Sequence, residues 1–185
     1  MSGEKDLFGK AIRKRRPKYE AMLERHDLRS VPERAQRIRW LETVIPKSSA
    51  YMMPMESATV FQEAKECFIY GFFASTIVLS AAFAEHWLGA TLLSRGINSI
   101  SDKGLAAITD YCRENEILPS GVCDKVDKIR KIRNPFVHLK SFEHPYALAQ
   151  RLMREKTNPS ALLEADARDA IVTIFAVAAY AKYAK

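Results

Sequence analysis

The chain lacks several features that would assign it to a familiar class of protein. Its three cysteines, Cys67, Cys112 and Cys123, show no CxxC spacing, which argues against a disulfide framework or a zinc site and for a reducing compartment. No GxxxxGK[ST] or GxGxxG loop and no paired acidic metal motif occurs, which argues against phosphate transfer through a bound nucleotide or metal. The N-terminal residues lack the apolar run of a signal peptide, so a cytoplasmic protein is expected.

Glycine and proline are also scarce, with seven and eight residues, and the sequence contains no internal repeat or low-complexity run. Hydrophobic residues make up 48% and charged residues 28%, which is ordinary for a globular protein with a core. The length of 185 residues suits one domain with an extension, or at most two small domains. Because no strand-like alternation or hairpin turn signal occurs, the sequence predicts an all-α fold.

Residues 67–84 contain no charged side chain and approach the length of about 20 residues that a membrane-spanning helix needs. Three hydroxyl side chains dilute this run, and Glu85 follows it at once without a flanking Lys or Arg. The central helix of a soluble bundle has the same composition. We therefore expect no membrane segment.

Positive charge is concentrated in the first quarter of the chain. Residues 1–47 carry a net charge of +6 out of the total of +7, and Arg13, Arg15 and Arg16 lie at the centre of this basic run. Such a field favours polyanionic partners, of which nucleic acid is the commonest. The alternative is a solvated basic arm that only keeps the protein soluble.

The apolar pattern divides the chain into a basic helical N-terminal extension (1–47), a linker (48–55) and a helical domain (56–185). In the extension, residues 30–33 have capping-box spacing with proline at the first helical position, which predicts a helix start there. In the domain, we expect one helix that ends at Gly71, a second over 72–93 and a third over 101–116. A fourth helix is expected to begin at a cap on Ser120, with an apolar stripe that reaches Phe136 and Leu139. Two further helices are expected to begin at His144 and at Asn158.

The stretch 133–138 places a guanidinium, an amide and an imidazole at the end of an amphipathic basic helix. The imidazole of His138 can move protons near neutral pH, and the guanidinium of Arg133 can stabilise charge on phosphoryl oxygens. On a regular helix these two side chains diverge by about 140°, but Pro135 is expected to kink, bulge or restart the helix and bring them to one mouth. The alternative is a helix-end arginine and a surface histidine that do no chemistry.

Residues 81–88 and 131–138 together resemble the polar helix and the Arg-x4–6-His motif of HEPN domains, many of which are ribonucleases of toxin–antitoxin and other defence systems. The resemblance covers roughly 56–185 and implies a compact helical bundle that cleaves RNA without a metal or cofactor. It implies that His138 transfers protons, that Arg133 stabilises the phosphoryl charge and that Asn134 orients His138 or the phosphate. We expect Glu85 to face this mouth, because a carboxylate in an apolar helix needs a polar neighbour.

The resemblance also implies a twofold dimer in which both motifs line one cleft, and it leaves room for a cognate antitoxin or regulatory protein. From charge alone, Arg130, Lys131 and Lys140 are expected to hold the RNA backbone beside the cleft, and the basic extension to lengthen that track. One alternative is a HEPN-like module without catalysis that binds a nucleic acid, a nucleotide or a protein. Another is a helical interaction module in which residues 1–47 dock on DNA or a protein.

Overall fold

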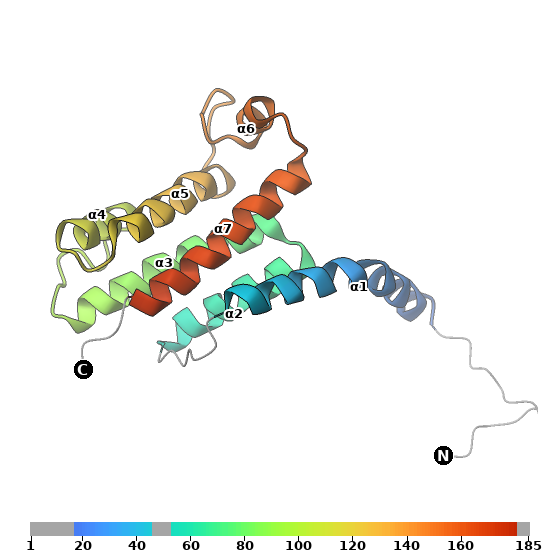
Figure 1. Cartoon of the computed structure of the whole chain (residues 1–185), viewed down its shortest axis with the longest axis horizontal. Helices are drawn as coiled ribbons and strands as arrows, with labels where there is room; N and C mark the ends of the chain where they lie inside the picture. The colour runs from blue at the N-terminus through green and yellow to red at the C-terminus, as the bar shows by residue number, and fades with distance from the viewer. Residues whose placement is uncertain (1–16, 46–52, 181–185) are drawn as a thin grey trace, which may run out of the picture.

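The computed structural model describes residues 17–45 and 53–180, which form seven α-helices and no strand (Figure 1). The predicted all-α fold is therefore confirmed over these ranges. Arg13, Arg15, Arg16 and most of the expected linker lie outside the described residues. The helices are α1 (Lys18–Val44), α2 (Met55–Tyr70), α3 (Phe73–Ser94), α4 (Leu105–Glu114), α5 (Ser120–Val137), α6 (Leu148–Glu155) and α7 (Pro159–Tyr180).

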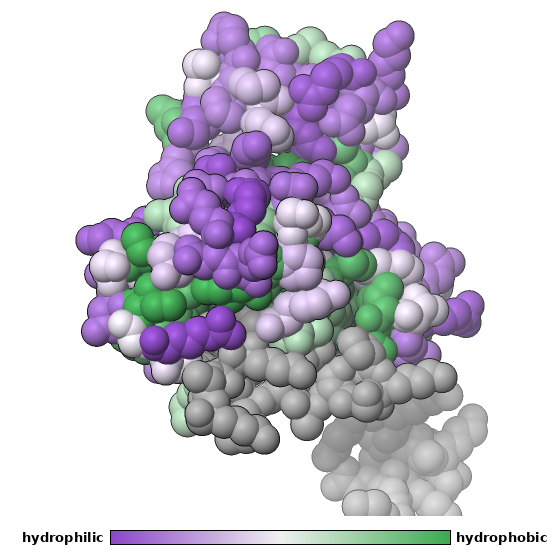
Figure 2. Space-filling model, turned by 60° about the vertical axis from the view of Figure 1, so that its left-hand side comes forward, coloured by the Kyte–Doolittle hydropathy of each residue, from purple (hydrophilic) through white to green (hydrophobic). Residues whose placement is uncertain are grey.

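Helix α3 is the central element of the bundle, and it contacts α2, α7, α5 and α4. Most of its large side chains are buried, including Phe83, Leu88 and Leu92, each with 0% exposure. Burying one such side chain stabilises the fold by about 1.5–3 kcal/mol. With this helix covered, the face drawn in Figure 2 shows mainly hydrophilic residues, with apolar ones in patches.

By length and composition, α3 is also the one helix of the described residues that could cross a membrane. In this fold 61% of its most apolar window is buried among the other helices. The core helix of a soluble bundle meets the same test of length and composition, so the expected lack of a membrane segment stays a prediction.

Several helix ends lie where the sequence predicts them. Helix α2 ends at Gly71, whose φ of +80° is the left-handed conformation that glycine adopts without strain, and the N–H of Phe72 donates to the carbonyl of Cys67 at 2.8 Å. The same arrangement ends α3 at Gly96. At the start of α7, the side-chain oxygen of Asn158 accepts a hydrogen bond from the N–H of Ala161 at 2.9 Å.

The predicted helix start at residues 30–33 is wrong, because α1 runs through Pro32 without a break. The hydroxyl of Ser30 donates to the carbonyl of Asp27 at 3.0 Å, which is a bond within the preceding turn and not a cap. Proline removes one helical hydrogen bond, but the residues that follow are anchored to other helices. Tertiary packing therefore outweighs the local capping pattern.

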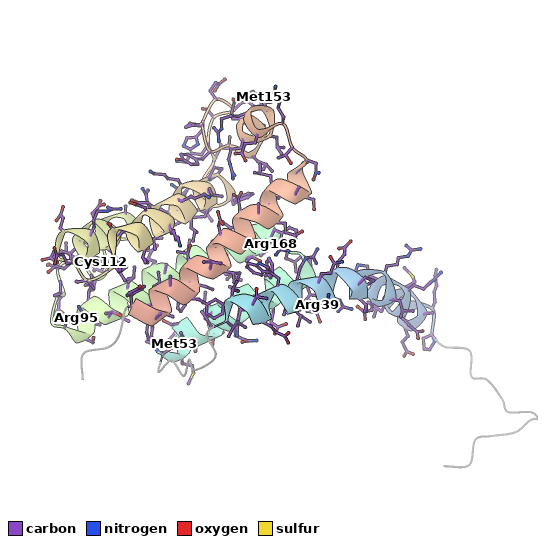
Figure 3. The ribbon with its side chains drawn as sticks, in the orientation of Figure 1. Arg39, Met53, Arg95, Cys112, Met153 and Arg168 are labelled. Atoms are coloured by element: carbon purple, nitrogen blue, oxygen red, sulfur yellow. The ribbon has the colours of Figure 1, made fainter. Side chains whose placement is uncertain are left out.

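The second half of α1 packs against α2 and α7. The buried guanidinium of Arg37 donates to the carbonyl of Ile69 at 3.2 Å, and Trp40 packs against Phe68 with ring centroids 5.0 Å apart. From α7, Arg168 lies over the Trp40 ring at 4.6 Å (Figure 3). The first half of α1 projects beyond the other helices, and its Tyr19 is 74% exposed (Figure 1).

Three other predicted helix starts need correction. Helix α4 begins only at Leu105, because the preceding loop first crosses α3, where the carbonyl of Ser101 lies above Gly89. Helix α5 begins at Ser120, but its hydroxyl makes no cap, since Pro119 holds the N-cap position. Helix α6 begins at Leu148, after two hydrogen-bonded turns between residues 141 and 147.

We predict that Gly89→Ala destabilises the protein, because a Cβ at this position would lie 2.5 Å from the carbonyl oxygen of Ser101. Overpacking of this kind costs about 1–3 kcal/mol of unfolding free energy, which urea denaturation measures. Gly121→Ala in α5 is the matched control, because a Cβ there meets nothing within 4 Å. Equal stability of the two variants would contradict the close approach of the loop to α3.

Candidate functional site

The structure brings Glu85 of α3 and Arg133 of α5 together, although 48 positions separate them in the sequence. Nη2 of Arg133 donates to Oε2 of Glu85 at 3.3 Å, and the two side chains are 21% and 38% exposed. The Nε of Arg133 is buried and has no hydrogen-bond partner among the described residues. The guanidinium is therefore held on one side by the carboxylate, and the side chain is partly open to solvent.

Glu85 lies beside the loop that leads into α4. A Cβ added to Gly104 would be 3.9 Å from Oε1 of Glu85, and Gly104 has a φ of +85°. Gly89, one turn further along α3, lies under the same loop. The close crossing of this loop therefore fixes one wall next to the Glu85 carboxylate.

The expected restart of the helix at Pro135 is not present, because α5 continues through Pro135 to Val137. Proline is tolerated here because it lies in the last turn, and the N–H of His138 still donates to the carbonyl of Asn134 at 2.9 Å. The chain leaves the helix at His138, which has extended backbone angles of −135° and 130° and an exposed side chain. His138 therefore lies where the chain leaves the helix, and no restart of the helix follows Pro135.

Among the described residues, no hydrogen bond joins His138 to Arg133 or to Glu85. The part of the expected site that the structure assembles is thus the Glu85–Arg133 pair, with Asn134 partly exposed in the next position. His138 lies one residue beyond the end of α5, open to solvent. This arrangement suits a proton-transfer group that meets its partner only when a substrate is bound.

The basic residues expected beside the site differ in their exposure and in whether they form ion pairs within the protein. Lys131 and Lys140 are exposed. Arg130 is partly buried, and its Nε donates to Asp127 at 3.1 Å, so its charge is already paired within the protein. Of the described residues in this set, Lys131 and Lys140 are therefore the better candidates for contacts with a phosphate backbone.

A cluster of charges holds α5 against α4. Arg113 of α4 donates to Asp127 at 3.1 Å and lies 2.9 Å from Asp110 and 3.3 Å from Asp124. Burial opposes ionisation of Asp127, but hydrogen bonds from Arg113 and Arg130 outweigh it and hold the pKa of Asp127 below its usual value. These contacts fix the orientation of the helix that carries Arg133.

The apolar stripe expected on α5 continues inward only as far as Ile132. Phe136 and Leu139 are 37% and 100% exposed, so the prediction that they belong to the inner face is wrong. Leu139 lies beyond the end of α5, where the helical period no longer applies, and Phe136 lies in the last turn of the helix. Phe142, which the sequence pattern does not single out, is 61% exposed in the same loop.

Sequence reasoning also missed the ion pair that holds α6. Arg151 of α6 and Asp166 of α7 are both buried and form a bidentate pair with distances of 2.5 and 2.9 Å. Arg154 of the same helix donates to the carbonyl of Pro145 at 3.2 Å. The first pair holds α6 against α7, and the second bond attaches α6 to Pro145, at the end of the loop in which Leu139 and Phe142 lie.

Two other features lie near the site. A pocket of about 180 Å³ between α3, α5 and α7 has Ile77, Ile129 and Ile132 in its lining, and the ion pair of Lys128 with Asp169 spans 2.5 Å beside them. Nδ1 of His86 and the hydroxyl of Ser57 form a hydrogen bond of 2.7 Å, which joins α3 to α2. In the ranges 17–45 and 53–180, no three His, Cys, Asp or Glu side chains are grouped to hold a metal ion.

Comparison with family models, with curated proteins and with solved structures found no match. The likeness to HEPN domains accordingly rests on residues 81–88 and 131–138.

We predict that Asp127→Asn lowers the unfolding free energy at pH 7 by about 1 kcal/mol and reduces the loss of stability in acid. A carboxylate with a lowered pKa stabilises the fold above its unfolded pKa of about 3.9, and this contribution disappears as the pH falls through the folded pKa. Urea denaturation between pH 7 and pH 3 measures both effects. Asp124→Asn is the control, because this exposed carboxylate should contribute less than about 0.5 kcal/mol.

Proposed function

We propose that the protein is a metal-independent endoribonuclease whose site comprises Glu85, Arg133, Asn134 and His138. The observation that supports this most is the pairing of Glu85 with Arg133, which joins the two segments that resemble HEPN domains. The exposed His138 follows on the same helix end. A held guanidinium and an accessible imidazole, carried five residues apart at one helix end, are groups suited to phosphodiester cleavage.

In the proposed reaction the ribose 2′-oxygen forms a bond to the adjacent phosphorus, and the bond from phosphorus to the 5′-oxygen of the next nucleotide breaks. His138 accepts the proton of the 2′-hydroxyl, and an acid returns a proton to the leaving 5′-oxygen. Arg133 stabilises the negative charge on the phosphoryl oxygens, and Glu85 holds Arg133 in position. The products are a 2′,3′-cyclic phosphate and a 5′-hydroxyl.

In this proposal two copies pair about a twofold axis, so that one His138 acts as base and the other as acid. Lys131 and Lys140 are exposed and can bind the RNA backbone. The setting we propose is a cytoplasmic defence or toxin–antitoxin system, in which a cognate protein restrains the nuclease. No cofactor enters this scheme.

A second candidate function is a non-catalytic interaction module. The projecting half of α1 supports it, because Tyr19, Leu23 and Leu28 in this half are 74%, 66% and 66% exposed. Exposed apolar residues on a helix suit docking to a protein. In that case the substitution of His138 changes no activity, whereas substitutions in α1 abolish binding.

The nuclease is tested by incubating the protein with labelled RNA in EDTA. We expect the wild-type chain to leave 2′,3′-cyclic phosphate ends and His138→Ala to lose about 100-fold or more in rate, which is the usual contribution of proton transfer. Arg133→Ala should lose a similar factor, and Glu85→Gln less. His26→Ala, in the exposed part of α1, is the matched histidine control and should retain full activity.

Cleavage that survives His138→Ala unchanged would contradict the assignment of the site. Absence of cleavage by the wild-type chain on several RNA substrates would favour the interaction module.

A further inference from the structure

The loop after α5 presents an aromatic ring close to the proposed site. The N–H of His144 donates to the carbonyl of Ser141 at 3.1 Å, which places Phe142 in the centre of a tight turn. Its side chain is 61% exposed, although an aromatic ring of this size is usually buried. Directly after the turn, the guanidinium of Arg154 donates to the carbonyl of Pro145 at 3.2 Å.

We propose that Phe142 is a stacking platform for a base of single-stranded RNA, and that Lys140 contacts the phosphate backbone beside it. This inference rests on the proposed function, since it names the form of RNA that the site accepts. Exposed aromatic rings combined with positive charge are the features by which proteins bind unpaired bases. Here Lys140 lies two residues before the ring and is exposed.

The distance along the chain suits one continuous ligand. Phe142 follows His138 by four residues, so their Cα atoms are at most about 14 Å apart. A strand whose phosphate lies at Arg133 and His138 can therefore reach the ring within a few nucleotides. Bases of a duplex are stacked on each other and are not available to a side chain, so the platform selects single strands.

The alternative is that the exposed loop is a contact surface for a second copy of the chain. The role of Leu139 distinguishes RNA stacking from an interface between copies, because Leu139 is 100% exposed and lies three residues before Phe142. An apolar protein interface would use both side chains. Stacking uses only the ring, since leucine has no π-face. The exposed Lys131 and Lys140 favour RNA, because lysine is depleted at the centre of protein interfaces.

The test measures binding in the His138→Ala background, so that the RNA stays intact. Fluorescence anisotropy is recorded with a labelled single-stranded oligoribonucleotide, and inorganic polyphosphate serves as a competitor that has charge but no bases. We expect Phe142→Ala to weaken RNA binding about tenfold and to leave polyphosphate binding unchanged, and Phe142→Trp to restore RNA binding. Lys140→Ala should weaken both, and Leu139→Ala should weaken neither.

Unchanged RNA affinity of Phe142→Ala would overturn the proposal. So would equal losses in Phe142→Ala and Leu139→Ala accompanied by a change in molar mass by light scattering, which would assign the loop to an interface between copies. If wild-type protein cleaves no RNA but its binding still depends on Phe142, the nuclease fails and the platform stands. If cleavage occurs and Phe142→Ala binds normally, the platform fails alone. If RNA does not bind at all, both fail.

Discussion

The structure depends on the burial of α3. Its apolar residues occupy most of its circumference, so it is stable only when other helices cover them, and α2, α4, α5 and α7 do so. One stripe, which contains Ser75, Ala82, His86 and Leu93, stays exposed. Each of these helices is oriented by what it covers. The position of Arg133 on α5 and the crossing of the 97–104 loop above Gly89 are therefore consequences of how α3 is enclosed.

This enclosure gives Glu85 its particular environment. The preceding Ala84 and, two residues on, Trp87 are buried, whereas Glu85 is 38% exposed and contacts the guanidinium of Arg133. A carboxylate in an apolar helix needs a partner or water, and here it has both. The pair contributes little to stability, because partly exposed ion pairs are typically worth less than about 1 kcal/mol. The Arg133 side chain is 21% exposed, so part of it can be reached from solvent, whereas its buried Nε cannot.

The proposed site is built from two kinds of structure. Arg133 lies on a helix that is fixed by the Arg113–Asp127 cluster, whereas His138, Lys140 and Phe142 lie on the chain that leaves this helix. The buried Arg151–Asp166 pair anchors α6 behind that segment. In the proposed site, the helix would bind the phosphate, and the accessible loop would supply the imidazole and the ring.

Local sequence signals predicted those helix ends that depend only on interactions within one turn. The left-handed glycines at 71 and 96 and the cap at Asn158 end and begin helices where expected, because each acts within one turn. The continuity of α1 through residues 30–33 could not be predicted from local signals. The capping pattern there indicates a helix start, but the anchoring of Arg37 and Trp40 on distant helices outweighs it.

The same distinction applies to the site. The need of Glu85 for a polar partner indicated Arg133, but nothing in the sequence indicated the Arg151–Asp166 pair, whose members lie on separate helices. The exposure of Leu139 depends on where α5 ends, and periodicity alone does not reveal that point.

The central claim is that Arg133 and His138 bind one phosphate of RNA together. NMR of the histidine side chains, during titration with an oligoribonucleotide that carries a 2′-deoxy sugar at the cleavage position, tests it most directly. The account predicts that the imidazole resonances of His138 shift on binding, that Arg133→Ala abolishes the shift, and that His26 does not respond. Binding of the oligonucleotide without any change at His138 would contradict it.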